Sequence, residues 1–149
     1  MGRVSFIGGL MSKAPGKAST SSKKDKPVVT VLVVDDDVTV CNVLEEFLRS
    51  RGYEVYTALD GPGAIAQVKE IRPHIVLLDI IMPGMGGIEI LKEIKRVDPS
   101  VAVVIVTGVR DNELGRRALE LGAYDYIIKP VDFDYLETVL KVKTIDLLG

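Results

Sequence analysis

The chain has 149 residues, of which 47% are hydrophobic and 27% are charged, as expected for a globular protein of one domain. Its single cysteine, Cys41, excludes an internal disulfide and a zinc site built from several cysteines, and favours a cytoplasmic location. No apolar run approaches the roughly 18 residues that a membrane-spanning helix needs, so we expect no membrane segment.

The formal net charge of −2 hides an asymmetry along the chain. Residues 1–27 carry a charge of +5, are rich in Ser and Lys and show no periodicity, so we interpret them as a disordered basic extension or linker. The remainder carries −7, which argues against direct nucleic-acid binding by the folded part.

From residue 28 onward, signals for strands and helices alternate. Short apolar, β-branched runs predict five strands, at 28–34, 53–57, 74–78, 101–106 and 124–128. Helical spacing and capping residues predict five helices, at 38–50, from the cap Asp60 to about 71, 87–97, 112–121 and 133–143. The expected domain therefore covers residues 28–145, with 146–149 as a tail.

Five consecutive strand–helix units with short connections predict an α/β fold with right-handed crossovers, a doubly wound parallel sheet. The second strand is the most polar and is expected at an edge. This favours the flavodoxin-like (βα)5 arrangement with strand order 2-1-3-4-5, whose switch point lies between the first and third strands.

Polar residues follow the predicted strands at their carboxyl ends. Asp35, Asp36 and Asp37 end the first strand and Asp79 the third. Thr107 and Lys129 follow the fourth and fifth strands. Because the carboxyl ends of parallel strands line the ligand crevice of such sheets, we expect these side chains to share one pocket.

This pocket has the groups needed to bind a divalent metal and a phosphoryl group. Asp35, Asp36 and Asp79 would repel one another, and a hard cation, Mg²⁺ or Mn²⁺, would relieve that repulsion. Asp79 stands alone on its strand and is the candidate nucleophile, forming an acyl phosphate. Lys129 would neutralise phosphoryl charge, and Thr107 would donate a hydrogen bond to it.

Each of these residues also has a purely structural explanation. Asp37 is expected to cap the following helix, Thr107 alone fits an ordinary strand position, and Lys129 alone fits a solvated surface. Their joint placement at strand ends favours the functional interpretation. Cys41 is expected to be a partly buried small residue, and His74, at the opposite end of its strand, is not expected to be a ligand.

Residues 29–141 resemble the receiver domain of two-component response regulators. The motifs that carry the resemblance are VLVVDD, LLDIIMPGMGG, VIVTG, ALELGAYDYI and KP, in that order. The resemblance implies a phosphorylation-dependent signalling switch that takes a phosphoryl group from a sensor histidine kinase or a histidine phosphotransfer protein. It implies no enzyme activity beyond transfer to the domain's own aspartate and autodephosphorylation.

The resemblance also implies roles for individual residues around the acidic pocket. Asp79 matches the phospho-acceptor, and Asp35 and Asp36 match the Mg²⁺ pair, with Asp36 preferred as direct ligand. The backbone carbonyl of Ile81 would be a further ligand. Because Ile81 and Val109 are apolar and cannot hold a hydrolytic water, a long-lived phosphoryl group is expected.

The remaining implied roles concern the switch. Thr107 matches the switch hydroxyl, and Tyr126 the aromatic residue that turns inward with it. Lys129 matches the lysine that pairs with the phosphoryl, with a cis bond to Pro130. The read-out face would span roughly 110–143 and would dock a downstream protein target, a missing output domain or a second copy in a homodimer. Tyr124, Tyr126, Arg116 and Arg117 would lie near such an interface.

Two alternatives remain open at this stage. The Asp35-x-Asp37 pattern after an apolar strand also resembles haloacid-dehalogenase-type phosphatases, with Asp35 as nucleophile, but a further acidic pair is missing downstream and Asp79 stays unexplained. A non-phosphorylated pseudo-receiver would be marked by loss of acidic residues, all of which are present here.

Overall fold

The computed structural model describes residues 27–148, so the predicted extension lies outside the described residues except for Pro27. Its strands are β1 (Thr30–Val34), β2 (Glu54–Ala58), β3 (Ile75–Leu78), β4 (Ala102–Thr107) and β5 (Asp125–Ile128). Its helices are α1 (Val38–Ser50), α2 (Gly61–Ile71), α3 (Gly87–Val97), α4 (Asn112–Glu120) and α5 (Phe133–Leu148).

The strands form one parallel sheet in the order β2-β1-β3-β4-β5, as the sequence predicts. The most polar strand, β2, lies at an edge. The sheet places β1 beside β3, with Val34 in register with Leu78. The two aspartates that follow these residues are therefore neighbours.

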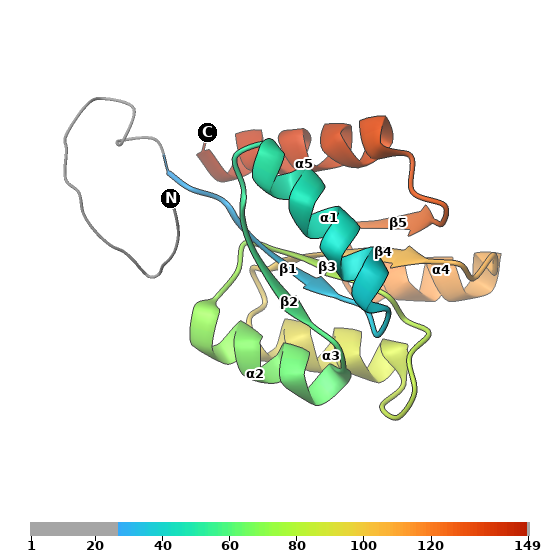
Figure 1. The fold of residues 1–149 in the computed structure, drawn as a ribbon. Helices are drawn as coiled ribbons and strands as arrows, with labels where there is room; N and C mark the ends of the chain where they lie inside the picture. The colour runs from blue at the N-terminus through green and yellow to red at the C-terminus, as the bar shows by residue number, and fades with distance from the viewer. Residues whose placement is uncertain (1–26, 149) are drawn as a thin grey trace, which may run out of the picture.

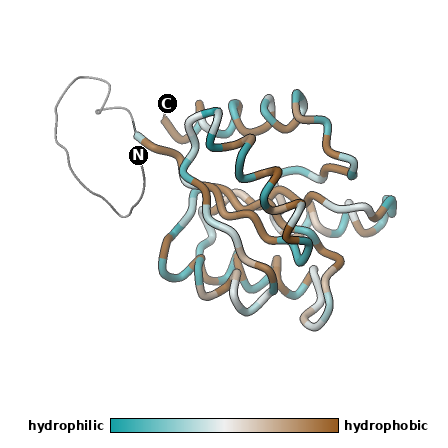
Figure 2. The backbone as a smooth tube through the Cα atoms, viewed as in Figure 1, coloured by the Kyte–Doolittle hydropathy of each residue, from teal (hydrophilic) through white to brown (hydrophobic). Residues whose placement is uncertain are grey.

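Helices cover both faces of the sheet, α1 and α5 on one side and α2, α3 and α4 on the other (Figure 1). Alternate strand residues point to the two layers: Val31 and Val33 pack with α1 and α5, and Leu32 and Val34 pack with α2 and α3. Burial on both faces explains why the central strands are apolar except for a threonine at the start of β1 and one at the end of β4; the apolar segments are brown in Figure 2.

Aspartates begin several helices, as the sequence predicts. Asp37 accepts hydrogen bonds from the backbone N–H groups of Thr39 and Val40, and Asp60 accepts one from that of Gly63. Each carboxylate satisfies donors that a helix start leaves unpaired. The Asp37 side chain therefore acts as the N-cap of α1.

Helix α5 is longer than expected. The prediction ended it near residue 143, but the helix runs to Leu148 and takes up residues 146–148, which were assigned to a tail. The reason is local: residues 144–148 include neither Gly nor Pro, and Ile145, Leu147 and Leu148 are compatible with helix. By contrast, α4 ends at Glu120, one residue early.

The loop between β3 and α3 packs closely against the carboxyl end of β3. A Cβ atom at Gly87 would lie 2.3 Å from both the backbone oxygen and the Cβ of Ile80, so a side chain has no room there. Gly84 adopts φ +91°, a conformation that favours glycine. These glycines let α3 begin directly beside the residue that follows Asp79.

Candidate functional site

Three carboxylates converge at the carboxyl edge of β1 and β3. Asp35 and Asp79 are buried, with 3% and 6% of their surface exposed, and Asp36 is exposed. One oxygen from each lies within 4.8 Å of the others. Carboxylate oxygens gathered this closely are a suitable donor set for a hard divalent cation.

Lys129 bridges the two buried carboxylates. Its Nζ lies 2.7 Å from Asp35 Oδ2 and 3.1 Å from Asp79 Oδ2. Burial by itself would lower the pKa of Lys129, but its hydrogen bonds to the two carboxylates and their charges outweigh burial, so the pKa is raised and the lysine stays charged. The peptide bond from Lys129 to Pro130 is cis.

Asp35 remains under electrostatic stress despite this lysine. Burial raises its pKa, and the hydrogen bonds from Lys129 and from the backbone N–H of Asp37 only partly offset that effect. Beneath it, the Cys41 thiol donates a hydrogen bond to the Asp35 carbonyl at 3.3 Å. Burial raises the pKa of Cys41 to about 11, so this thiol is an inert core group, more deeply buried than the sequence suggested.

The two oxygens of Asp79 have different partners. Oδ1 accepts a hydrogen bond from the backbone N–H of Ile81 at 2.9 Å, and Oδ2 accepts from Lys129. The Ile81 side chain is exposed above this edge. Asp79 is thus fixed in orientation by the loop that follows its own strand.

Thr107 contributes an unsatisfied hydroxyl. The residue is fully buried at the end of β4, and within the described residues its Oγ1 is a buried side-chain atom without a hydrogen-bond partner. A buried hydroxyl without a partner costs about 1–3 kcal/mol. Such a group marks a place that a ligand atom or a conformational change can complete.

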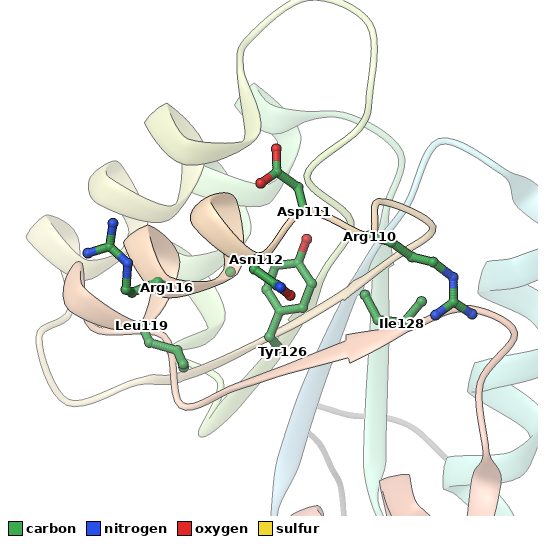
Figure 3. Close-up of a pocket in the computed structure, with 8 residues that line it drawn as sticks. Arg110, Asp111, Asn112, Arg116, Leu119, Tyr126 and Ile128 are labelled. Atoms are coloured by element: carbon green, nitrogen blue, oxygen red, sulfur yellow. The ribbon is translucent and has the colours of Figure 1, made fainter.

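Tyr126 ties the loop after Thr107 to helix α4. Its hydroxyl donates to the carbonyl of Val109 at 3.0 Å. Its ring lies 3.5 Å from where a Cβ of Gly115 would stand, so it packs on the α4 backbone. The ring lines a hollow of about 420 Å³, and Figure 3 shows it among the other side chains that line this hollow. The residues lining the hollow are Arg110, Asp111, Asn112, Gly115, Arg116, Leu119, Tyr126 and Ile128.

Gly115 was not singled out from the sequence. A glycine in the interior of a short amphipathic helix costs roughly 1 kcal/mol, which was the available signal. The structure supplies the reason for it, because the glycine makes room for the aromatic ring.

His74 lies away from this site, as expected. Its Nδ1 accepts a hydrogen bond from the backbone N–H of Thr30 at the amino edge of the sheet. Its backbone pairs with Thr30 and Ala102. His74 therefore stabilises the sheet through these hydrogen bonds, and the acidic site lies at the opposite end of the strands.

Residues 31–141 match the family described as the response regulator receiver domain. The chain belongs to this family. The match runs through every strand and includes Asp35, Asp79, Thr107 and Lys129. It leaves no support for the phosphatase alternative.

Similar proteins agree with this assignment. The transcriptional regulatory protein ZraR of Salmonella typhimurium is 45% identical over 113 residues, which cover 76% of this chain and 26% of that protein. This receiver domain thus spans about a quarter of the length of those curated relatives. The sporulation initiation phosphotransferase F of Bacillus subtilis is 37% identical over 111 residues, 74% of this chain and 90% of that protein.

A solved structure extends the likeness to three dimensions. A chain in the crystal structure of the CheX–CheY–BeF3–Mg²⁺ complex from Borrelia burgdorferi superposes with a TM-score of 0.74 at 32% identity, covering 76% of this chain and 87% of that one. Among the helices described here, none is long and apolar enough to cross a membrane.

Proposed function

We propose that this receiver domain is a phosphorylation-dependent switch in which Asp79 accepts a phosphoryl group from a sensor histidine kinase or a histidine phosphotransfer protein. One observation carries the proposal. A buried, oriented carboxylate, an acidic pair, a bridging lysine and a hydroxyl without a partner among the described residues occur together at the carboxyl edge of the sheet. No role in the fold requires all of them together.

The chemistry proposed for Asp79 is nucleophilic substitution at phosphorus. An Asp79 oxygen forms a bond to phosphorus while the P–N bond of the donor phosphohistidine breaks. The imidazole keeps the electron pair and takes up a proton. Lys129 is placed to pair with the phosphoryl oxygens, and the Ile81 N–H holds the remaining Asp79 oxygen.

The donor set fits Mg²⁺ or Mn²⁺. Three carboxylates face one lysine here, which leaves an excess of negative charge that a divalent cation would balance. Asp35, Asp36, Asp79 and the Ile81 backbone carbonyl would hold the ion, with Asp36 the preferred direct ligand because it is exposed and, among the described residues, has no ion pair. When bound, the metal would supply positive charge to phosphoryl oxygens.

The switch proposed for this domain runs from Thr107 to the read-out face. The hydroxyl of Thr107 gains a partner in the phosphoryl group, and the loop from Thr107 to Val109 then shifts against the Tyr126 hydroxyl that holds it. The two states differ in their contacts to the phosphoryl, which is what biases a two-state equilibrium.

The surface that changes would be that of α4, β5 and α5. The hollow beside Tyr126 is on this surface and would receive a downstream protein target, an output domain or a second copy. The cytoplasm is the proposed compartment, because the phosphodonor classes named above act there.

A phosphorylation assay tests the proposal. The protein is incubated with Mg²⁺ and acetyl phosphate and compared by intact mass with Asp79→Asn, Asp35→Asn and, as a matched surface control, Asp134→Asn. We expect one added phosphoryl on the wild type and on Asp134→Asn, less on Asp35→Asn and none on Asp79→Asn.

Other results would redirect the interpretation. Uptake by Asp79→Asn at the wild-type level, with none by Asp35→Asn, would move the nucleophile to Asp35. No uptake by any variant, from acetyl phosphate or from a phosphorylated histidine donor, would favour the pseudo-receiver.

A further inference from the structure

Strand β2 forms one edge of the sheet, so one side of its backbone faces away from the other strands. The N–H of Glu54 and the carbonyl of Ala58 form hydrogen bonds toward β1, at 3.0 Å and 3.1 Å. Because the two sides alternate along a strand, Val55 and Thr57 direct their backbone groups outward. Such an outward row of N–H and C=O groups is a template on which another strand can pair.

Both outward carbonyls of β2 already accept a hydrogen bond from a side chain. Arg49, on α1, donates from Nη2 to the Val55 carbonyl at 2.7 Å. Gln67, on α2, donates from Nε2 to the Thr57 carbonyl at 2.7 Å. Helices α1 and α2 lie on opposite faces of the sheet, so the edge is held from both sides (Figure 1). We call Arg49 and Gln67 the edge clamp.

A second contact orients the arginine of the edge clamp. The Arg49 Nε donates to the carboxylate of Glu45, one turn earlier on α1, at 2.9 Å. A guanidinium carries its N–H groups in a rigid plane, so a single side chain can hold the carboxylate and the Val55 carbonyl at the same time. Arg49 is therefore fixed over the strand edge by its own helix.

The stability of the fold does not by itself explain the edge clamp. Carbonyl groups at an exposed strand edge can accept hydrogen bonds from water, so they need no donor from the protein. The exposed ion pair between Arg49 and Glu45 contributes at most about 1 kcal/mol. What the two side chains do change is access, because another strand must displace both of them before it can bond to the same carbonyls.

We propose that the edge clamp closes β2 to strand pairing, and that removing both side chains lets the β2 strands of two copies pair and join their sheets. A second copy is the expected occupant, because it supplies the same edge strand and a twofold axis can pair the two. Strand β5 forms the other edge, so this contact is separate from the read-out face proposed above. It requires neither phosphorylation nor metal.

Sedimentation equilibrium of the full chain, in EDTA and without phosphodonor, tests the closure. We expect the double variant Arg49→Ala/Gln67→Ala to form a dimer at least about tenfold tighter than any that the wild type forms. Each single variant leaves one carbonyl covered and should fall between the two. Arg96→Ala, which removes an exposed arginine from its helix partner Glu93 on α3, is the matched control and should behave like the wild type.

Amide hydrogen exchange measured by NMR locates the contact. In the double variant, the N–H groups of Val55 and Thr57 should exchange more slowly at high protein concentration than at low concentration. In the wild type, their exchange should not depend on concentration. A folded double variant that is no more associated than the wild type would overturn the proposal. A dimer in which the exchange at these two residues stays unchanged would overturn it as well.

Circular dichroism establishes that each variant is folded. A second double variant, Arg49→Met/Gln67→Met, keeps the length of both side chains and removes only their donors, and it should dimerise in the same way. If neither double variant folds, the two side chains are needed for the fold itself, and the proposal is wrong.

Discussion

The two edges of the sheet treat buried polar groups in opposite ways. At the amino edge, the Thr30 hydroxyl donates to Glu54 at 3.1 Å and the His74 imidazole accepts from the Thr30 N–H at 3.0 Å. At the carboxyl edge, Asp35 and Asp79 share a single lysine and the Thr107 hydroxyl has no partner among the described residues. The fold itself supplies hydrogen-bond partners for the polar groups of the amino edge, whereas those of the carboxyl edge need a ligand to balance and pair them.

The pKa of one group at each edge is shifted, and the two shifts have opposite directions: Asp35 at the carboxyl edge and His74 at the amino edge. Burial raises the pKa of Asp35, so ionising this carboxyl opposes folding and a drop in pH relieves the strain. Burial lowers the pKa of His74, so a drop in pH opposes folding there. Electrostatic stress that a cation would relieve is thus found at the carboxyl edge, beside the proposed phospho-acceptor.

The largest expected effect is that of removing the shared lysine. Lys129→Met leaves two buried carboxylates without their counter-charge, and we expect it to lower the free energy of unfolding by about 3 kcal/mol at neutral pH without metal. Urea denaturation measures this, and added Mg²⁺ should recover part of the loss. Lys92→Met, which removes an exposed lysine 3.8 Å from Glu89, should change stability by less than about 0.5 kcal/mol. Equal small effects of both variants would show that the carboxyl edge is not under stress.

The lifetime of the phosphoryl group tests how well the loaded carboxyl edge excludes reactive water. Because Ile81 and Val109 cannot orient a water by hydrogen bonding, we expect slow decay in Mg²⁺ buffer and about tenfold faster decay in Ile81→Asn. Intact mass against time measures both rates. Leu59→Asn, at another exposed residue in the loop between β2 and α2, is the control and should decay like the wild type. Loss of the wild-type phosphoryl within seconds would contradict the prediction.

Matched threonine substitutions compare the two edges directly. Thr107→Val removes a hydroxyl that has no partner within residues 27–148, so we expect the unliganded protein to gain about 1 kcal/mol of stability. Thr30→Val removes a hydroxyl that donates to Glu54, so we expect a loss of about 1 kcal/mol. Chemical denaturation measures both. Changes of the same sign would erase the distinction between the edges.

The smallest expected effect is the pH dependence from His74. The unfolded chain, with an ordinary pKa near 6.5, takes up its proton before the folded chain does. The contribution of neutral His74 to the free energy of unfolding is therefore fully present above that pH, and it is lost as the pH falls toward the lowered pKa of His74 in the folded state. His74→Asn keeps an acceptor for the Thr30 N–H without titrating. We expect the wild type to lose up to about 1 kcal/mol more than this variant between pH 7 and pH 5; parallel pH profiles would exclude the effect.

Much of this structure could be predicted from the sequence, for identifiable reasons. Apolar β-branched runs marked the strands, the polar character of β2 placed it at the edge, and the strand order brought Asp35 and Asp79 together. These predictions depend on periodicity and on general rules of parallel sheets, which act over short stretches of chain.

Other features depend on contacts that no local pattern records. The sequence predicts that Lys129 shares a pocket with Asp35 and Asp79, but not that its Nζ bridges both carboxylates, from 94 and 50 residues away along the chain. The orphaned hydroxyl of Thr107 depends on what surrounds it in space. The predicted end of α5 is too early because residues 144–148 contain no residue that stops a helix. The role of Gly115 depends on the Tyr126 ring, which packs against it from another element.

The most direct test of the central claim is the stability of wild type and Thr107→Val with and without Mg²⁺ plus beryllium fluoride, a mimic of the phosphoryl group. We predict that Thr107→Val is the more stable protein without ligand and that this advantage disappears or reverses with both ligands bound, because the threonine hydroxyl then has a partner. If Thr107→Val were more stable than the wild type by the same amount in both conditions, the account would be contradicted, because the phosphoryl group would then not supply a hydrogen-bond partner for Thr107.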